Sequence, residues 1–368
     1  AVSGVGYFVN TTAGAITVTL PLSPAAGAVI GVSDYAGTAD TNNITVGRNG
    51  SNINGAAADL TIAQENSAVT LVYVDGTQGW KATDTSSLSD IELAPTYITA
   101  TGGTITEDGD YKVHTFTGPG AFCVSGLGNP VGGPSDVEYL VVAGGGGGGK
   151  GNSHGSGAGA GGYRVSPAVP ISVTSFPIVV GAGGAGAPTA TPRVPGGDGN
   201  TSSFNSIAST GGGGGIGWST CAGRPGGSGS GAACSPTPTN FGAGNTPPVS
   251  PPQGNPGGAN NPAGSRMGGG GGAGEAGGTD GFGFGGDGLS NSISGSAVFY
   301  AGGGGAGGSS CGCSSIPGGD GGGGIGSGST TGGAGTANTG GGGGGSYSTQ
   351  VGGTGGSGVV IIRYKFQN

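Results

Sequence analysis

The cysteines carry the most reactive side chains in this 368-residue sequence, and four of the five lie in its second half. Cys221 and Cys234 lie in one insertion rich in proline, serine and glycine. A disulfide between them would close a loop of about 14 residues and add roughly 3 kcal/mol of stability. Cys311 and Cys313 could instead pair with these two and fasten two loops together. Either pairing indicates an oxidising compartment.

A Cys-x-Cys metal site at Cys311 and Cys313 is the alternative, because thiolates bind zinc. Such a site needs further Cys or His ligands, and His154 is the only histidine in the glycine-rich half. We therefore favour disulfides and expect no metal. Cys123 lies in a short strand-like run, which predicts a small buried apolar residue.

Aspartates beside glycine offer a second possible kind of metal site, because carboxylate and backbone oxygens ligate calcium. They are Asp198, Asp280, Asp287 and Asp320. No spacing matches a known calcium loop, and Asp-Gly first of all favours a turn. Catalysis has little support: the sequence has two histidines, no nucleophile elbow and no phosphate-binding Gly-Lys-Ser/Thr. We expect a protein that is not an enzyme and has no cofactor.

Aromatic residues are few in the glycine-rich half, and such rings commonly anchor interfaces. The candidates for contact with a binding partner are Trp218, Phe282, Phe284, Tyr300 and Tyr347. Trp218 and the pair Phe282 and Phe284 are the strongest of these. The alternative, favoured for each ring taken singly, is that the rings cap the ends of glycine segments and supply the burial that glycine cannot.

Most of the candidate residues named above lie in a part of the chain that is dominated by glycine, and this part must position them. Of the 99 glycines, 20 lie in residues 1–140 and the rest follow. The second half is too poor in side chains for a conventional core, and its glycines lack the strict three-residue period of collagen. The net charge of −8 and the absence of a basic stripe speak against nucleic-acid partners. The apolar runs are too short to span a membrane, so we expect no membrane insertion. Isolated cations are interpreted as solubility or rim residues: Lys150, Arg164, Arg193, Arg224 and Arg266.

The first part of the chain has the pattern of β-structure. Apolar residues alternate with threonine in residues 15–20, and residues 44–46 and 69–74 repeat the pattern. Arg48-Asn49-Gly50-Ser51 predicts a β-hairpin, because Asn-Gly tolerates the positive φ of a type I′ turn. The predicted domains are a small β module at 1–86, a linker at 87–95, a β-sandwich-like module at 96–143, a glycine-rich bundle at 144–358 and a closing strand at 359–368.

Glycine runs recur at 144–149, 211–215, 268–272, 302–305, 321–324 and 340–345. Composition alone would favour a flexible linker. A linker has no need of an apolar strand at each end, yet 137–143 and 359–366 are such strands. We therefore predict polyglycine-II helices, which lack internal hydrogen bonds and must bond to neighbouring helices. The predicted fold is all-β modules followed by a polyproline/polyglycine-II bundle bracketed by β-strands, with essentially no α-helix.

Several segments of the sequence resemble the tail-fibre proteins of marine and cyanobacterial phages. These segments are Tyr7 to Gly14, Thr41 to Val46, Leu71 to Trp80, Asp108 to Gly144, Gly161 to Arg164, Val179 to Gly184 and Gly358 to Tyr364. The second half is also similar to the distal adhesins of T-even-like phages, in which a polyglycine-II sandwich displays variable loops. Those adhesins are separate tip proteins, whereas this chain continues from a β module, and no receptor-contacting residue can be transferred.

The resemblance implies a receptor-binding protein at the tip of a virion tail fibre, which attaches to a bacterial host through a glycan or an outer-membrane protein. In such a protein the partner of the five candidate rings is the receptor. The resemblance also implies association with other fibre chains, as a homotrimer. Two other classes stay open. An ice-binding glycine-rich protein would need a regular flat face, and an extracellular filament or matrix protein should show an internal repeat that these loops lack.

Overall fold

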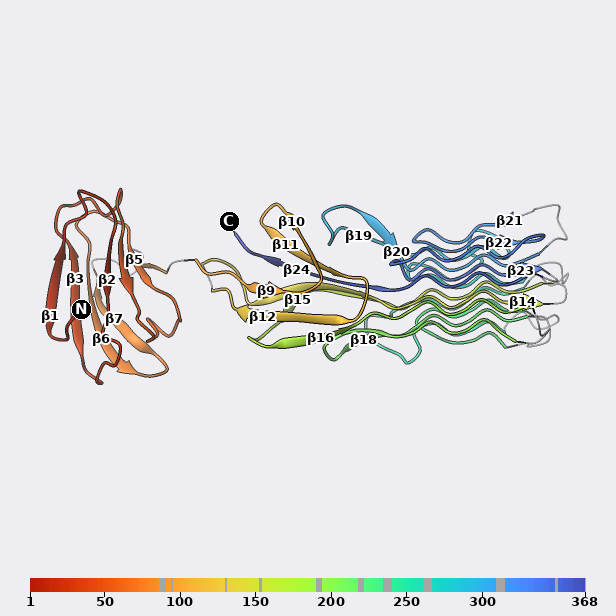
Figure 1. Cartoon of the computed structure of the whole chain (residues 1–368), viewed down its shortest axis with the longest axis horizontal. Helices are drawn as coiled ribbons and strands as arrows, with labels where there is room; N and C mark the ends of the chain where they lie inside the picture. Colours follow the sequence, from red (N-terminus) through yellow and green to blue (C-terminus); the bar gives the residue numbers. More distant parts are fainter. Residues whose placement is uncertain are drawn as a thin grey trace. The chain divides into compact units, whose positions relative to one another are not determined.

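The computed structural model describes residues 1–85, 91–93, 95–129, 131–151, 154–189, 194–217, 222–233, 240–260, 267–308, 315–347 and 350–367. These residues form strands and extended segments and no helix, which confirms the all-β prediction. Nothing in the described chain is a helix long and apolar enough to cross a membrane. The chain divides into two compact units (Figure 1). The first consists of Ala1–Ile98, Gly126–Ser135 and Lys365–Asn368, and the second of Thr99–Ser125 and Asp136–Tyr364.

Two four-stranded sheets form the first unit. One has the order β1 (Val5–Val9), β3 (Val29–Asp34), β6 (Ala68–Asp75), β7 (Gly79–Thr85). The other has the order β2 (Ile16–Thr19), β4 (Ile44–Gly47), β5 (Leu60–Ile62), β8 (Ile91–Leu93). Both sheets contribute apolar side chains to one core, in which Ile44, Leu71 and Trp80 are fully buried. The predicted strands at 15–20, 44–46 and 69–74 are thereby confirmed as β2, β4 and β6.

The positive φ expected at Asn49 and Gly50 is confirmed, at 47° and 91°, but the tight hairpin predicted there does not form. Glycine and asparagine tolerate this conformation. The turn does not join two strands directly, since β5 begins only at Leu60. The intervening loop instead folds inward and places Ile53 in the core.

The second unit begins with two five-stranded sheets. One has the order β10 (Thr104–Asp108), β11 (Tyr111–Phe116), β24 (Val359–Lys365), β13 (Asp136–Val142), β15 (Tyr163–Pro170). The other has the order β18 (Ile207–Ser209), β17 (Ser202–Phe204), β16 (Ser175–Val179), β12 (Gly120–Gly126), β9 (Thr99–Thr101). Rings from both sheets meet between them: Phe122 of β12 lies 5.0 Å from His114 of β11 and 6.1 Å from Tyr364 of β24, measured between centroids.

The two strands that bracket the glycine-rich region are confirmed, and they are neighbours. β13 pairs antiparallel with β24, and Val142 lies opposite Val359. Since β15 pairs with the other side of β13, the sandwich takes strands from both ends of the glycine-rich region. Residues 96–143 therefore do not form a separate module in the structure. Short hairpins complete the unit: β19 (Leu289–Asn291) pairs with β20 (Val298–Tyr300).

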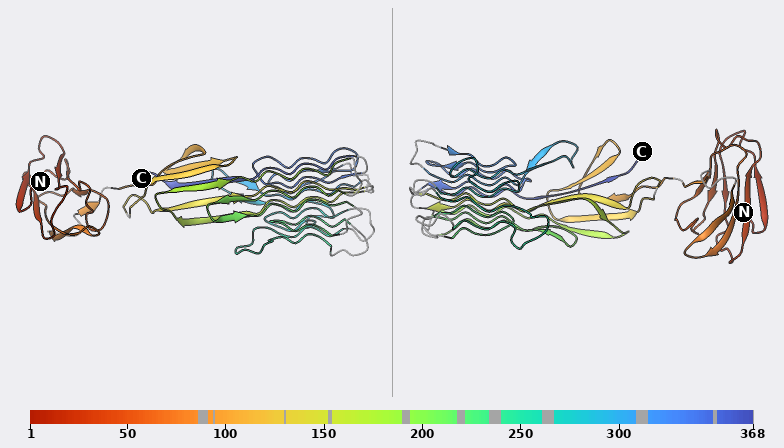
Figure 2. Two further views of the ribbon diagram at one scale, coloured as in Figure 1. Left: turned by 60° about the horizontal axis from the view of Figure 1, so that its bottom comes forward. Right: turned by 180° about the vertical axis from the view of Figure 1, so that it is seen from behind.

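Extended glycine segments continue from these strands to the opposite end of the second unit and lie side by side in all views (Figures 1 and 2). We call them glycine rods. The rod at 144–149 shows how they are joined, because its N–H groups three residues apart donate to the same neighbour. The bonds, at N···O distances of 2.7–3.0 Å, are Gly144 to Asn200 and Gly147 to Gly197, Gly145 to Gly356 and Gly148 to Gly353, and Gly146 to Gly159 and Gly149 to Ser156.

The carbonyl groups of this rod follow the same three-residue period with three further rods. The donors are Gly212 and Gly215, Gly184 and Ala187, and Gly343 and Ser346, at 2.8–3.0 Å. The rod thus has six hydrogen-bonded neighbours and no unsatisfied backbone group. A three-residue period with outward-pointing donors and acceptors is the geometry of polyglycine II, and it confirms the predicted bundle.

Close approach of the main chains explains why the rods are glycine. A Cβ added at Gly145 would lie 2.1 Å from the carbonyl oxygen of Gly341, and one at Gly148 would lie 1.9 Å from that of Gly344. Larger residues occur where rods leave space. A small apolar cluster of Ile216, Ala233, Met267 and Ala306 is one such place, and all four side chains are fully buried.

Candidate functional site

The rods end together at the side of the second unit away from the sandwich (Figure 1). There β14 (Lys150–Gly151) pairs in parallel with β23 (Ser346–Tyr347), and β21 (Ser315–Ile316) pairs antiparallel with β22 (Gly326–Ser327). An isolated bridge joins Gly155 to Gly217. We call this end the rod tips. Segments that are far apart in the sequence therefore end at one surface of the second unit.

Lys150, His154 and Tyr347 are the chemically distinctive side chains at the rod tips. The ring of His154 lies 5.5 Å from that of Tyr347 in an edge-to-face arrangement. Burial lowers the pKa of His154. Lys150 is only 6% exposed, and its Nζ donates to the carbonyl of Thr189 at 2.8 Å. Lys150 is thus a buried structural cation, not the solubility residue expected from its isolation in the sequence.

The aromatic candidates occupy different environments. Phe282 is 49% exposed, in a turn next to Met267 and Ile316, whereas Phe284 and Tyr347 are half-buried. Tyr300 is 5% exposed and packs in the interior near the sandwich with Tyr163. An exposed receptor contact at Tyr300 does not fit this placement, since its ring belongs to a buried apolar cluster that also contains Val359.

Five of the predicted site residues lie outside the described residues. They are Trp218, Cys221, Cys234, Cys311 and Cys313. The receptor contact at Trp218 and the disulfides stay predictions.

Cys123 is exposed, so the prediction that it is buried is wrong. The strand period explains the difference. Phe122 and Val124 of β12 point into the sandwich core, and the residue between them must point outward. The Sγ of Cys123 lies 3.3 Å from the Oγ of Ser175 on the neighbouring strand.

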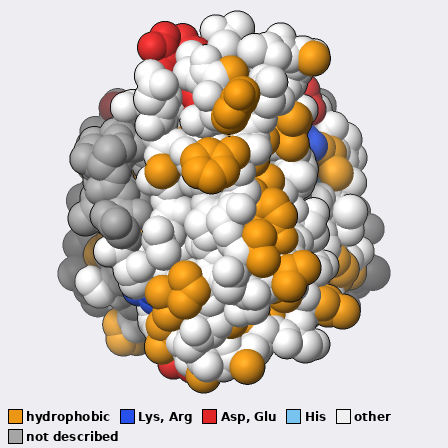
Figure 3. Space-filling model, turned by 90° about the vertical axis from the view of Figure 1, so that its left-hand side faces the viewer, with side chains coloured by type: hydrophobic (Ala, Val, Ile, Leu, Met, Phe, Trp, Pro, Cys, Tyr) orange, Lys and Arg blue, Asp and Glu red, His pale blue; other side chains and the backbone are white. Residues whose placement is uncertain are grey.

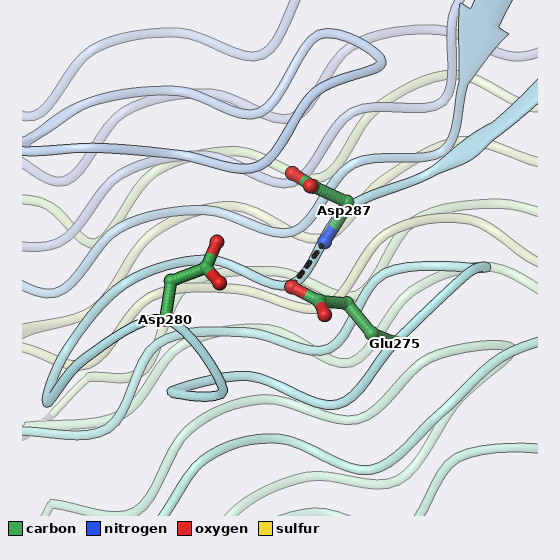
Figure 4. Close-up of side chains that lie close together, drawn as sticks. All are labelled: Glu275, Asp280 and Asp287. Atoms are coloured by element: carbon green, nitrogen blue, oxygen red, sulfur yellow. Dashed lines mark hydrogen bonds between the residues drawn. The ribbon is translucent and has the colours of Figure 1, made fainter.

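Three carboxylates meet on one side of the bundle. Oxygens of Glu275, Asp280 and Asp287 all lie within 4.8 Å of one another (Figure 4). The sequence places Asp280 and Asp287 in turns but gives no sign of Glu275, which a chain reversal at 278–283 brings next to Asp287. The Oε1 of Glu275 accepts a hydrogen bond from the Asp287 amide at 3.3 Å. Such oxygens are ligands of the kind that hard cations take. The Oε1 of Glu275 and the Oδ1 of Asp287 also accept hydrogen bonds from backbone amides.

The other two aspartates have structural partners. Asp198 forms an ion pair with Arg224, and its Oδ1 accepts from the amide of Gly214 at 2.8 Å. The amide of Asp320 donates to Oδ1 of Asp287 at 2.6 Å. These bonds hold rods and turns in place, as expected of Asp-Gly sequences.

A family model described as "Glycine-rich domain" matches residues 128–365. The match begins before β13 and ends in β24, so it spans the bracketing strands, the rods and the rod tips. No curated protein matches the sequence.

Proposed function

The chain belongs to the glycine-rich domain family, and we propose that it is the distal tail-fibre adhesin of a bacteriophage. In this proposal the segments at the rod tips bind a bacterial surface receptor, either a glycan or an outer-membrane protein. In this proposal the protein is a part of the virion that binds the host and is not an enzyme. It needs no cofactor, has no nucleic-acid partner and does not insert into a membrane.

The observation that carries the proposal is the closed hydrogen bonding of the rods. The rod at 144–149 satisfies its backbone entirely through six neighbouring rods. Because these bonds join main-chain atoms, they do not depend on which side chains the rod tips carry. In this proposal the side chains at the rod tips vary while the rod hydrogen bonds stay the same, which suits the recognition of variable receptors.

The first unit supports association with further copies of the chain. Several large apolar side chains on it are exposed, among them Phe8 at 78% and Tyr35 at 68%. Figure 3 shows clusters of hydrophobic side chains on one face, with few charged side chains between them. Exposed patches of this kind mark interfaces. We propose that three chains bury these residues in the fibre.

Adsorption to cells tests the adhesin proposal. The labelled full chain should bind a subset of candidate marine bacteria and compete with infecting phage. Phe282→Ala should weaken binding about tenfold or more, the effect of losing an interface anchor. Phe299→Ala is the matched control, because Phe299 is equally exposed at 47% but lies in β20, near the sandwich. Failure to bind any host of the phage that encodes the chain, or thermal hysteresis in its place, would overturn the proposal.

Analytical ultracentrifugation of the full chain tests the trimer. The expected species is a trimer that Phe8→Ser shifts toward monomer, since that change removes an exposed ring without altering the core. A monomer at every concentration would contradict the association.

A further inference from the structure

A cavity of about 310 Å³ opens on the flank of the second unit, beside edge strand β15. This volume is at the lower end of the range found for small-molecule sites. Its lining residues are Tyr139, Tyr163, Arg164, Val165, Ser166, Ser250, Pro251, Pro252 and Leu289. None of them belongs to the rod tips, so the cavity is separate from the surface discussed above.

The proline wall of the cavity is fixed in place by Gln253, which is 1% exposed. Its Oε1 accepts from the amide of Thr210 at 2.8 Å, and its backbone carbonyl accepts from the amide of Tyr163 at 2.8 Å. Asn245 Oδ1 accepts from the amide of Val249 at 3.1 Å and braces the same segment. The wall is therefore preformed, which lowers the entropic cost of binding a ligand.

Arg164 gives the cavity a positive charge. Its Nη1 donates to the carbonyl of Ala208 at 3.3 Å. Within the described residues the ion pairs are Arg224–Asp198 and Arg363–Asp108, so no described carboxylate neutralises Arg164. The charge acts inside the cavity: burial raises the pKa of Tyr139, and the nearby Arg164 opposes that rise. A guanidinium in this setting favours an anionic ligand group, a carboxylate or a phosphate.

Hydroxyl groups of a ligand would also find partners. The Tyr163 hydroxyl accepts from Asn291 Nδ2 at 2.8 Å, which leaves its own hydrogen available to an acceptor. The Tyr163 amide points away from β13, toward Gln253. By strand alternation the N–H and C=O of Val165 point the same way, toward the cavity. Pro167, the next outward residue, has no N–H, so an added β-strand could not pair along this edge.

We propose that this cavity binds one carboxylate-bearing sugar unit, a uronic acid, of a bacterial surface glycan. Arg164 pairs with the carboxylate, the tyrosine hydroxyls and the Val165 backbone bond the ring hydroxyls, and Pro251, Pro252 and Leu289 cover the apolar ring face. The source of the ligand rests on the proposed adhesin function, whereas the chemistry of the site rests on the cavity alone.

Titration calorimetry of the full chain with digalacturonate, and with neutral digalactose as its uncharged counterpart, tests this site. Digalacturonate should bind at least tenfold more tightly, and its affinity should fall as salt rises. Arg164→Gln should weaken it about tenfold or more, the loss expected for a charge-assisted hydrogen-bonded pair. Arg48→Gln, which removes the same charge from the first unit, should leave it unchanged.

Leu289→Glu provides a second test that leaves the core intact, because Leu289 is 41% exposed. The new carboxylate should repel digalacturonate without affecting thermal stability. Equal binding of the neutral sugar, no binding of either, or no response to both variants would overturn the proposal. The two proposals fail separately. Cell adsorption without any binding of digalacturonate leaves the adhesin and removes the flank site, whereas digalacturonate binding without adsorption does the reverse.

Discussion

The first unit buries large side chains such as Leu71 and Trp80, whereas the rods of the second unit bury mainly glycine main chain. The first core is stabilised by the removal of apolar surface from water, which depends little on direction. The rods depend on hydrogen bonds, which need donors and acceptors at about 2.9 Å and in line. The first unit and the rods should therefore respond oppositely to substitution: smaller residues damage the first unit, and larger residues damage the rods.

The largest expected effect is that of Gly145→Ala. The added Cβ would lie 2.1 Å from the Gly341 carbonyl oxygen, so two rods must separate and their shared bonds must break. We expect the second unit to lose at least about 5 kcal/mol, in the range of the most disruptive substitutions. Differential scanning calorimetry measures this loss. Gly118→Ala is the control, because a Cβ there meets nothing within 4 Å. Equal melting of both variants would show that the rods are not closely packed.

Trp80→Ala should produce the corresponding loss in the first unit. The ring is fully buried and lies 5.5 Å from Tyr73, edge to face. Its removal leaves a cavity that costs about 3 to 5 kcal/mol. In the same calorimetric scan Tyr35→Ala should cost less than about 0.5 kcal/mol, because that ring is exposed. A transition of the first unit that is unaffected by Trp80→Ala would contradict a side-chain core.

Acid should destabilise the second unit more than the first, by less than the two core substitutions above. Burial lowers the pKa of His114, whose ring is fully buried between the sheets and contacts the Gly102 carbonyl and the Tyr364 hydroxyl. The unfolded chain therefore binds a proton more readily than the folded one, and stability falls as the pH drops below about 6.5. The loss is at most about 1.4 kcal/mol per pH unit for this residue.

Both histidines, His114 and His154, lie in the second unit, and burial lowers the pKa of each. The melting midpoint of the second unit should thus fall between pH 7 and pH 5. The first unit contains no histidine and serves as the internal control for histidine protonation. An unchanged second unit would mean that His114 is not buried in its neutral form.

The smallest expected effect is that of Arg224→Gln. The ion pair with Asp198 joins two rod segments, but both side chains are more than one-third exposed, at 36% and 45%. Exposed pairs contribute less than about 1 kcal/mol, and less still at high salt. Chemical denaturation at low and high salt should show this small difference for the wild type and none for the variant. A loss comparable to that of Gly145→Ala would mean that side chains, and not main chain, hold the rods.

Local patterns predicted the individual elements well. Alternation identified β2, β4 and β6, and apolar runs identified β13 and β24, because burial of one or both strand faces leaves a direct record in the residue order. The same period, applied to Cys123, would have placed it outside once Phe122 was known to point inward. Tyr300 was harder to place, because a ring beside a glycine run can lie at either end of a rod.

The cavity at Arg164 could not be predicted, because it joins residues distant in sequence, and the acidic cluster at Glu275 depends on the exact path of a chain reversal. Arg164 meets Pro251 only after the chain has passed through several rods, and Asp287 meets Glu275 through a chain reversal. Neither of these two contacts leaves a pattern in the neighbouring sequence.

The sequence by itself determined that the second half would be built from main chain, since long glycine runs offer nothing else to bury and their amides must find partners. Only the tertiary structure decided which rods are neighbours. Glycine runs are chemically alike, so no side chain specifies that 144–149 bonds to 196–200, 352–356 and 156–159. That choice accompanies the pairing of β13 with β15 and β24, whose side chains can set the register from which the rods continue.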